Sequence, residues 1–567
     1  MTEKQGLFKS SIILFVAMII TKVVGAVFKI PLANILGGSG MGYFSSAYGL
    51  FWPVYSIVAA GLPIAVVRLV AENSAKGNVC NLRKIKRISL IYFSLVGLIG
   101  SIVILACARV FSNNLAQNPD AYMAVIAMAP SVFFCCVMAV YRGYYEGLQN
   151  MYPTAVSQVV ESLVKAVFGL GLSYGVLQYG IRSYERGGLV FGKAATTFEQ
   201  ATMLTLPYAA AAATLGVTIS TFAGLVAVLI RHRIYGDGIK RQDLKHSQGA
   251  STNREIFSRL FITAIPIAIG AAFISISSLI DLATIIRGLS SAIKASPRYF
   301  AEKYKFALID GVSLDELANF IYGSYTGLAS TIIAFIPAMS TMFGKSALPS
   351  LTASWSVGNK VAIKHNIETV LRASALFAIP AGLGLFVMAE PALMLLYPNR
   401  PSEVSIAALP LAVMSIGAIM FAIVTPVFSM LQAIGRTDLP VKLMAFCAVI
   451  KLIGNVVLIR IPSVNILGAS ISTTISYSVI TIIGIALLLH NAGVGLRIKR
   501  IFILPTIAGI ACAVGAALMK NSSFLEFQPK AKTIVCIGFG AILYAIVLFL
   551  TGGIRKNEIF DKINHKK

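Results

Sequence analysis

The chain has 567 residues, of which 57% are hydrophobic and only 12% are charged, and its formal net charge is +26. Because a soluble domain carries about 25% charged residues, this composition excludes disorder and most soluble folds. A basic chain can bind nucleic acid, but here the positive charge lies in short loops between long apolar stretches. That placement argues against nucleic acid as the partner.

Apolar stretches of roughly 20 residues recur along the whole chain, and each can cross ~30 Å of hydrocarbon as a helix. Strands of a membrane β-barrel would be about ten residues long with alternating polarity, a pattern that these stretches do not follow. The sequence therefore predicts an all-α integral membrane protein with about 14 transmembrane helices. In chain order they are expected at about 11–35, 43–69, 88–109, 121–145, 154–178, 203–230, 258–286, 318–346, 369–392, 404–430, 440–460, 465–489, 501–519 and 533–552.

Lysine and arginine gather in alternate loops between these spans. Clusters lie at 76–87, in the loop 231–259, at 497–500 and in the tail from 555, whereas the loop 37–42 has no charge. Such a bias marks the cytoplasmic side of a membrane protein, so we expect both termini in the cytoplasm. The first span is too long for a signal-peptide core and no small-residue cleavage site follows it, which indicates an uncleaved helix.

Weak similarity between the two halves of the chain indicates an internal duplication. Lys165 in the fifth span and Lys451 in the eleventh each follow a Leu-Gln pair and a proline, Pro153 and Pro440. Six spans per copy is an even number, so both copies insert in the same orientation as a parallel repeat. The expected divisions are an N-lobe at 1–231, a cytoplasmic linker at 232–257, a C-lobe at 258–490, and two further helices with a basic tail at 491–567.

Basic residues outnumber acidic ones within the predicted spans, where a charge costs several kcal/mol unless it faces a cavity or a partner. Lys22 and Lys29 are seven residues apart and so lie on one helix face. Lys165 and Lys451 are expected near the same depth, one from each half. Together the four lysines predict a central, electropositive cavity that binds an anion, because ammonium groups act as point charges toward phosphate.

Other charges in the spans are candidates for a gate or for coupling. Glu161 and Lys165 are an i,i+4 pair, which forms either a self-neutralising structural pair or a proton- or sodium-sensitive carboxylate beside the site. Arg68 and Lys345 each lie near the inner end of a span. They either extend to the membrane interface or form a cytoplasmic gate.

Asp281 lies near the outer end of the seventh span with Arg287 close by, which suggests an ion pair that closes the outer mouth. Nothing in the sequence indicates catalysis. The stretch 344–346, Gly-Lys-Ser, mimics the end of a phosphate-binding loop, yet the glycine required five residues earlier is Met339. No cysteine or histidine spacing predicts a metal site. We therefore expect a transporter with no catalytic residue, metal or cofactor, driven by the membrane potential or by coupling to Na⁺ or H⁺.

The run at 21–73, TKVVGAVFKIPLANILGGSGMGYFSSAYGLFWPVYSIVAAGLPIAVVRLVAEN, resembles the polysaccharide-exporter branch of the MATE-like (MOP) flippase superfamily. Within that branch, the chain is similar to the group of stage V sporulation protein B and the MurJ-type lipid II flippases of Gram-positive bacteria. The supporting stretches are YRGYYEGLQNMYP at 141–153, LIDLATIIRGL at 279–289, YGSYTGLA at 322–329 and LQAIGRTDLP at 431–440.

The resemblance implies two six-helix lobes that open alternately to each side of the membrane. It implies that basic residues of the first helix line the cavity, a role that falls on Lys22, with Lys29 as the second group. It also implies a groove for a lipid tail along the last two helices. The chain departs from the Gram-negative pattern in the second span, where Tyr55 and Ser56 occupy the stretch in which those proteins place arginine.

We therefore expect a flippase of the bacterial cytoplasmic membrane. Its expected cargo is a polyprenyl-diphosphate-linked cell-wall precursor, with lipid II favoured, which it moves from the inner to the outer leaflet. One alternative is the same mechanism with an O-unit, teichuronic or capsular oligosaccharide as cargo. Another is a cation-coupled multidrug exporter, although that class needs cavity carboxylates where this chain has mostly lysines. A third is a non-transporting scaffold for wall synthesis. Expected partners are membrane lipids and cell-wall synthesis proteins.

Overall fold

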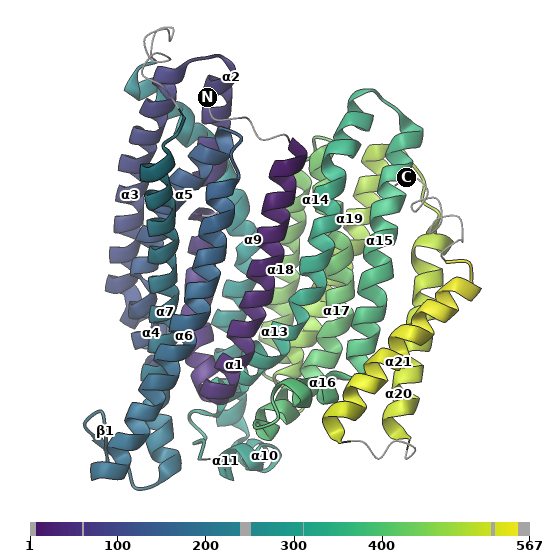
Figure 1. The fold of residues 1–567 in the computed structure, drawn as a ribbon. Helices are drawn as coiled ribbons and strands as arrows, with labels where there is room; N and C mark the ends of the chain where they lie inside the picture. Colours follow the sequence, from purple (N-terminus) through teal and green to yellow (C-terminus); the bar gives the residue numbers. More distant parts are fainter. Residues whose placement is uncertain (1–6, 59–61, 239–250, 310, 523–527, 554–567) are drawn as a thin grey trace. The chain divides into compact units, whose positions relative to one another are not determined.

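The computed structural model describes residues 7–58, 62–238, 251–309, 311–522 and 528–553, most of them helical (Figure 1). The chain forms two compact units. The first unit comprises Met1–Arg287 and Tyr304–Gly323, and the second comprises Gly288–Lys303 and Ser324–Lys567. These two units do not coincide with the two copies that the internal duplication predicts. The predicted lobes at 1–231 and 258–490 therefore stay a prediction.

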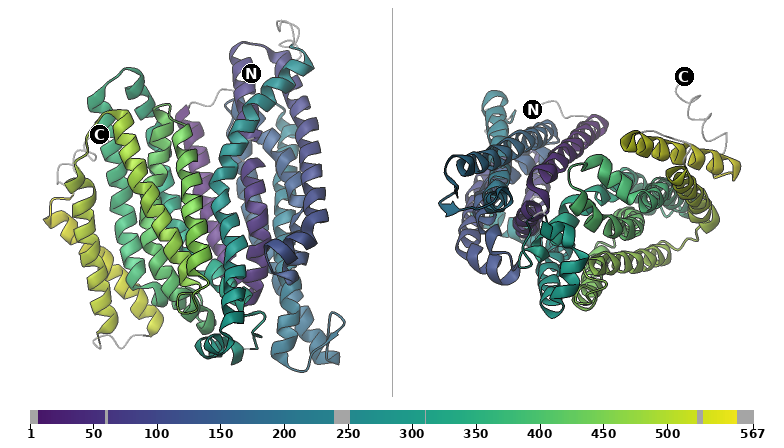
Figure 2. Two further views of the ribbon diagram at one scale, coloured as in Figure 1. Left: turned by 180° about the vertical axis from the view of Figure 1, so that it is seen from behind. Right: turned by 90° about the horizontal axis from the view of Figure 1, so that it is seen from below.

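The first unit is a helical bundle with one short hairpin, in which β1 and β2 pair antiparallel. The helices α6 and α7 lie side by side over much of their length, and α1 packs against α6 (Figures 1 and 2). In chain order its elements are α1 (Leu7–Ser56), α2 (Leu62–Ala75), α3 (Val79–Val110), η2 (Phe111–Leu115), η3 (Pro119–Ala121), α4 (Tyr122–Met128), α5 (Pro130–Gly147), α6 (Tyr152–Gly187), β1 (Leu189–Val190), β2 (Lys193–Ala194), α7 (Phe198–Tyr235), the first part of α9 (Asn253–Ala295), α11 (Lys305–Ile309) and α12 (Leu317–Ser324).

The second unit begins with the end of α9 and continues to the C-terminal helices. In it α17 packs against α14, α15 and α19, while α20 packs against both α15 and α21. Its remaining elements are α10 (Pro297–Lys303), η4 (Tyr325–Ala329), α13 (Ser330–Ile333), α14 (Phe335–Ser356), α15 (Lys360–Val387), α16 (Ala389–Leu396), α17 (Pro401–Ala433), α18 (Asp438–Leu458), α19 (Leu467–Ala492), η5 (Lys499–Ile503), α20 (Leu504–Asn521) and α21 (Pro529–Leu550).

The all-α membrane fold is confirmed, since thirteen helices among the described residues are long and apolar enough to cross a membrane. The first of them, Val16–Ser56, has 41 residues and would extend about 60 Å if straight, twice the ~30 Å of a bilayer core. It contains a break at Gly37, whose φ of 61° and ψ of −168° are not helical. That conformation favours glycine, because a side chain would clash there.

The break at Gly37 corrects the boundaries expected for the first two spans. The predicted uncharged loop at 37–42 is a single non-helical residue, and helix resumes immediately after it. Within the predicted second span at 43–69, α1 ends at Ser56 and α2 begins at Leu62, and residues 59–61 between them lie outside the described residues. Glycine allows so sharp a break without a loop, and the hydrophobic pattern carries no signal for it.

A small polar cluster and two glycines hold α12 against the chain that follows this break. Asn319 of α12 donates a hydrogen bond to the carbonyl of Ser39 (3.0 Å), and the Asn118 amide donates to the Asn319 side chain (2.7 Å). One turn later, a methyl group on Gly323 would fall on the carbonyl oxygen of Gly38. The two backbones are thus in direct contact, as is common where glycines face each other in membrane helices.

We expect Gly323→Ala to destabilise the protein by about 1–3 kcal/mol, because the added methyl group forces α12 away from α1. The measurement is the midpoint of thermal unfolding of the purified protein in detergent. Gly171→Ala on α6 is the matched control, since no heavy atom lies within 4 Å of the position that its methyl group would take. Equal midpoints for the two variants would contradict the close contact.

Candidate functional site

Three lysines of the first unit, Lys22, Lys29 and Lys165, form a set that we call the basic face. Lys22 is exposed and Lys29 is half-buried, two turns apart on α1. Lys165 comes from α6, and its ammonium group lies over the ring of Phe28 at 5.5 Å from the ring centre. Lys29 directly follows Phe28 in α1, so it lies next to the ring that Lys165 contacts. The predicted grouping of first-span and fifth-span lysines therefore has a geometric basis in this unit.

The packing of α1 on α6 brings these lysines together. The Phe28 ring lies directly against Gly169, where any larger side chain would collide with it. Phe28 also meets Phe44 edge to face, with ring centres 6.2 Å apart. The buried ring fixes the rotation of α1 about its axis. Helical spacing then sets the side of α1 on which Lys29 and Lys22 lie.

An aromatic ladder continues from Phe44 along the second half of α1. Neighbouring rings in this ladder are stacked, tilted or edge to face, with centres 5.3 to 6.4 Å apart. Trp52 is 44% exposed, whereas Phe44 and Phe51 are buried. Ring pairs at such separations are favourable, so the buried rings support the accessible ones. Its members are Phe44, Tyr48, Phe51, Trp52 and Tyr55.

Glu161 pairs with an arginine that the sequence analysis did not single out. The Arg142 guanidinium donates to the Glu161 carboxylate at 3.0 Å and to the Ser157 hydroxyl at 2.8 Å. The two side chains are only 10% and 17% exposed. The carboxylate thus contacts α5, whereas Lys165, the partner proposed at i+4, lies over Phe28. Arg142 lies three residues inside the end of the predicted span 121–145, a place where arginine more often extends to the interface.

The remaining candidates of the first unit lie on α2 and α9. Arg68 is exposed on α2, one turn before Glu72, which pairs with Lys76 at 2.6 Å. Arg287 is exposed and donates to the carbonyl of Asn114 at 3.0 Å. Asp281 is half-buried on α9. The predicted outer gate formed by Asp281 and Arg287 stays a prediction.

In the second unit, Lys451 is buried, with only 2% of its surface exposed. It lies on α18 one turn before Asn455, which accepts a hydrogen bond from Ser472 of α19. A hydrogen bond between α18 and α19 thus lies one turn from Lys451. Polar neighbours are expected where a charge is withdrawn from lipid. Lys345 lies on α14, but its side chain is outside the described residues.

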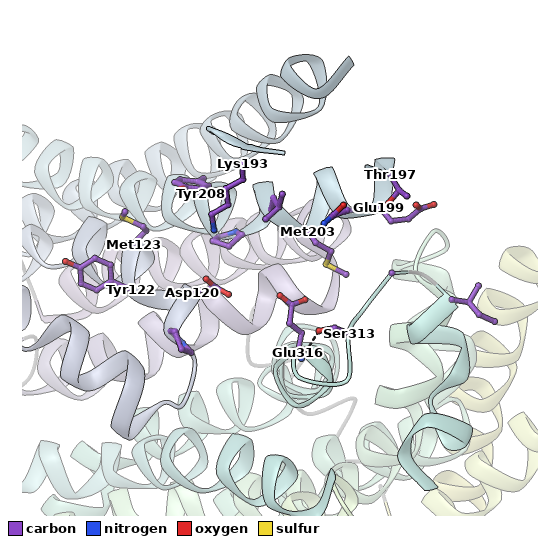
Figure 3. A pocket seen from close by; sticks show the side chains of 16 residues that line it. Asp120, Tyr122, Met123, Lys193, Thr197, Glu199, Met203, Tyr208, Ser313 and Glu316 are labelled. Atoms are coloured by element: carbon purple, nitrogen blue, oxygen red, sulfur yellow. Dashed lines mark hydrogen bonds between the residues drawn. The ribbon is translucent and has the colours of Figure 1, made fainter. Parts of the chain in front are cut away.

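The first unit also contains a pocket of about 570 Å³ that the sequence analysis did not predict (Figure 3). Three segments that are distant in sequence form it: the start of α4, the hairpin with the start of α7, and the chain before α12. The Thr197 side chain accepts the backbone N–H of Gln200 and begins α7, while Ser313 accepts that of Glu316. These caps fix the first turns that carry the pocket's charges.

Carboxylates dominate the pocket, with Asp120, Glu199 and Glu316 facing one lysine, Lys193. Burial raises the pKa of Glu316 above its ordinary value of 4.5, and the nearby charges of Asp120 and Asp315 add to the shift. The pocket is therefore opposite in charge to the basic face. No single sequence window signals it, because its acids come from three separate segments.

Known proteins resemble this chain in both sequence and fold. Residues 7–186 match the family model described as polysaccharide biosynthesis protein. The chain is 24% identical to "Lipid II flippase MurJ" of Bacillus subtilis (strain 168), over 97% of this chain and 96% of that protein. It is also 24% identical to "Stage V sporulation protein B" of the same organism, over 98% and 97% of the two chains. The solved structure "Lipid II flippase MurJ, inward closed conformation" superposes with a TM-score of 0.67 at 13% identity, covering 95% of this chain and 98% of that chain.

The thirteen membrane-length helices and the superposition show a multi-pass, all-helical membrane fold like that of the MurJ structure. The family-model match and the two relatives are consistent with the resemblance of the sequence to the polysaccharide-exporter branch of the MATE-like (MOP) superfamily. The basic face lies on α1 and α6, and both helices fall within the stretch that matches the family model.

We expect Arg142→Met to lower the stability of the protein by about 3–5 kcal/mol, because it leaves the Glu161 carboxylate buried without its partner. Denaturant unfolding of the purified protein measures the change. The double variant Arg142→Met/Glu161→Leu removes both charges and should recover much of the loss. A double variant as unstable as the single one would show that packing, and not the ion pair, dominates.

The raised pKa of Glu316 predicts a pH-dependent effect of Glu316→Gln. An acid that holds its proton more tightly in the folded state opposes folding once it ionises, as the pH rises above 4.5 and through the raised pKa. The variant should therefore unfold at a higher temperature than the parent at pH 7, and at the same temperature below pH 4.5. Glu185→Gln, which removes an exposed carboxylate, should change neither. A gain that persists at low pH would exclude ionisation as the cause.

Proposed function

We propose that this protein is a flippase for a lipid-linked, diphosphate-bearing cell-wall precursor, with lipid II as its cargo. The observation that best supports this is the basic face: Lys22, Lys29 and Lys165 lie on the packed helices α1 and α6, within stretches apolar enough to span a membrane. Ammonium groups in such a place are costly unless an anion or water faces them. The relative named "Lipid II flippase MurJ" aligns over nearly the whole chain, and its name points to the same class of cargo.

Electrostatics explains how such a face moves the cargo. The diphosphate linkage is anionic and cannot cross hydrocarbon unaided, so the lysines replace its hydration shell while the polyprenyl chain stays in lipid. The aromatic ladder suits the sugar units, because amphipathic rings present flat apolar faces beside polar edges. An inside-negative potential favours outward movement of negative charge by about 2.3 kcal/mol per charge per 100 mV, so no ATP is needed.

The remaining assignments complete the proposal. Lys451 keeps its predicted role as a cavity lysine of the second half. Glu161, held by Arg142, is the candidate for coupling to Na⁺ or H⁺. Arg68, Asp281, Arg287 and Lys345 are gate candidates. The protein acts in the bacterial cytoplasmic membrane with both termini in the cytoplasm, as the distribution of basic loops predicts.

We expect Lys29→Ala and Lys165→Ala each to slow flipping of fluorescent lipid II in protein-containing liposomes by at least about tenfold, the effect of losing ~1.4 kcal/mol of binding to the charged headgroup. Lys22→Ala should act in the same direction. Lys193→Ala is the matched control, since it removes a lysine that lines the acidic pocket instead of the basic face.

A lipid-linked oligosaccharide that lacks the pentapeptide is compared in the same liposomes. If it crosses and lipid II does not, the cargo is a different lipid-linked glycan and the lipid II assignment is wrong. If neither crosses and a cationic dye is extruded instead, the protein is a multidrug exporter and the whole proposal fails.

A further inference from the structure

A separate pocket of about 370 Å³ lies in the second unit, between the first half of α15 and the chain that leads into α20. The wall contains three arginines: Arg372 of α15, Arg500 of η5, and Arg497 from the chain just before η5. Glu368 is its one carboxylate. The pocket is therefore a basic cavity, and no part of the proposed transport site lines it.

Two hydrogen bonds position the charged groups. The Glu368 carboxylate accepts the backbone N–H of Arg497 at 3.0 Å, which holds the entering chain against α15. The Arg372 guanidinium donates to the carbonyl of Gly553, just beyond the end of α21. These hydrogen bonds connect α15 to the chain before η5 and to the residue beyond α21. Basic residues that only mark the cytoplasmic side of a membrane protein need no such ordered arrangement.

The pocket lies at the level where both of its helices change from polar to apolar. Along α15 the charged residues end at Arg372, and the sequence is apolar from there to the end of the helix. Arg497 and Arg500 likewise precede the apolar run of α20. Leu376 and Ile501 form the apolar part of the wall. This level corresponds to the headgroup layer of a membrane.

Exposed apolar side chains continue from the pocket along α20. Ile503 and Ile507 are each 47% exposed, and Ile498 beside the arginines is 60% exposed. A ligand seated among the arginines would therefore have a lipid-facing surface next to it. Amphiphiles with an anionic head and an apolar chain match both parts.

We propose that this pocket binds the phosphate group of a membrane lipid and holds that lipid against α15 and α20. Arginine suits the role because its planar fork matches phosphate oxygens, and basic pockets between membrane helices are known to hold anionic headgroups. The inference does not rest on the proposed function, because a lipid can be held at this site whether or not the protein flips a cargo.

The test is native mass spectrometry of the full-length protein released from detergent, titrated with dioleoylphosphatidylglycerol. The variant Arg497→Gln/Arg500→Gln should bind this lipid about tenfold more weakly, given about 1 kcal/mol for each basic residue near a lipid headgroup. The control Arg233→Gln/Arg254→Gln removes the same charge from exposed arginines of the first unit and should change binding less than about twofold. Arg372 is kept because it also anchors the end of α21. Thermal unfolding of both variants confirms that they fold.

Two further probes separate the sources of the phosphate. Dioleoylglycerol has the same chains without phosphate and should not bind. Glycerol 3-phosphate tests the headgroup alone: binding as tight as that of the lipid, and lost in the same variant, would show that the pocket is a phosphate site for a soluble ligand and would overturn the lipid assignment. Equal weakening in both arginine variants, or weakening in neither, would overturn the site itself.

Discussion

A lysine ammonium group within a membrane-spanning helix is stable only where water, an anion or a polar partner replaces the solvent it has lost. In the first unit, Lys22 is exposed and Lys29 and Lys165 are half-buried, so water or an anion can reach this face. In the second unit, Lys451 is buried beside the hydrogen-bonded side chains of α18 and α19. This contrast is the reason why we propose the lysines of the first unit as the main recognition site.

The packing of small residues holds that face in place. Gly169 allows the Phe28 ring to lie on α6, and that contact sets the direction in which Lys29 points. Gly37 breaks α1 without a loop, so the lysines on one side of the break and the aromatic ladder on the other belong to one short stretch of chain. Gly323 lets α12 pack directly on the chain after the break. Rigid packing of this kind fixes the positions of the charged groups on their helices.

Much of this architecture could be predicted from the sequence, because apolar length and helical spacing are local properties. The spans, the two C-terminal helices and the shared face of Lys22 and Lys29 all follow from such patterns. Contacts between helices were not predictable in the same way. Glu161 has a lysine at i+4, yet its partner is Arg142, nineteen residues away on another helix. The acidic pocket combines three distant segments and the arginine pocket combines two, and no spacing rule connects the segments of either pocket.

The central claim is that the basic face recognises the charge of a lipid-linked diphosphate, and a charge series of ligands tests it most directly. We would measure binding of a polyprenyl diphosphate, the corresponding monophosphate and the free alcohol to the purified protein, and to Lys29→Gln/Lys165→Gln. The account predicts that affinity falls in that order for the parent, and that the three ligands bind almost equally to the variant. If the uncharged alcohol binds the parent as tightly as the diphosphate does, the claim is wrong.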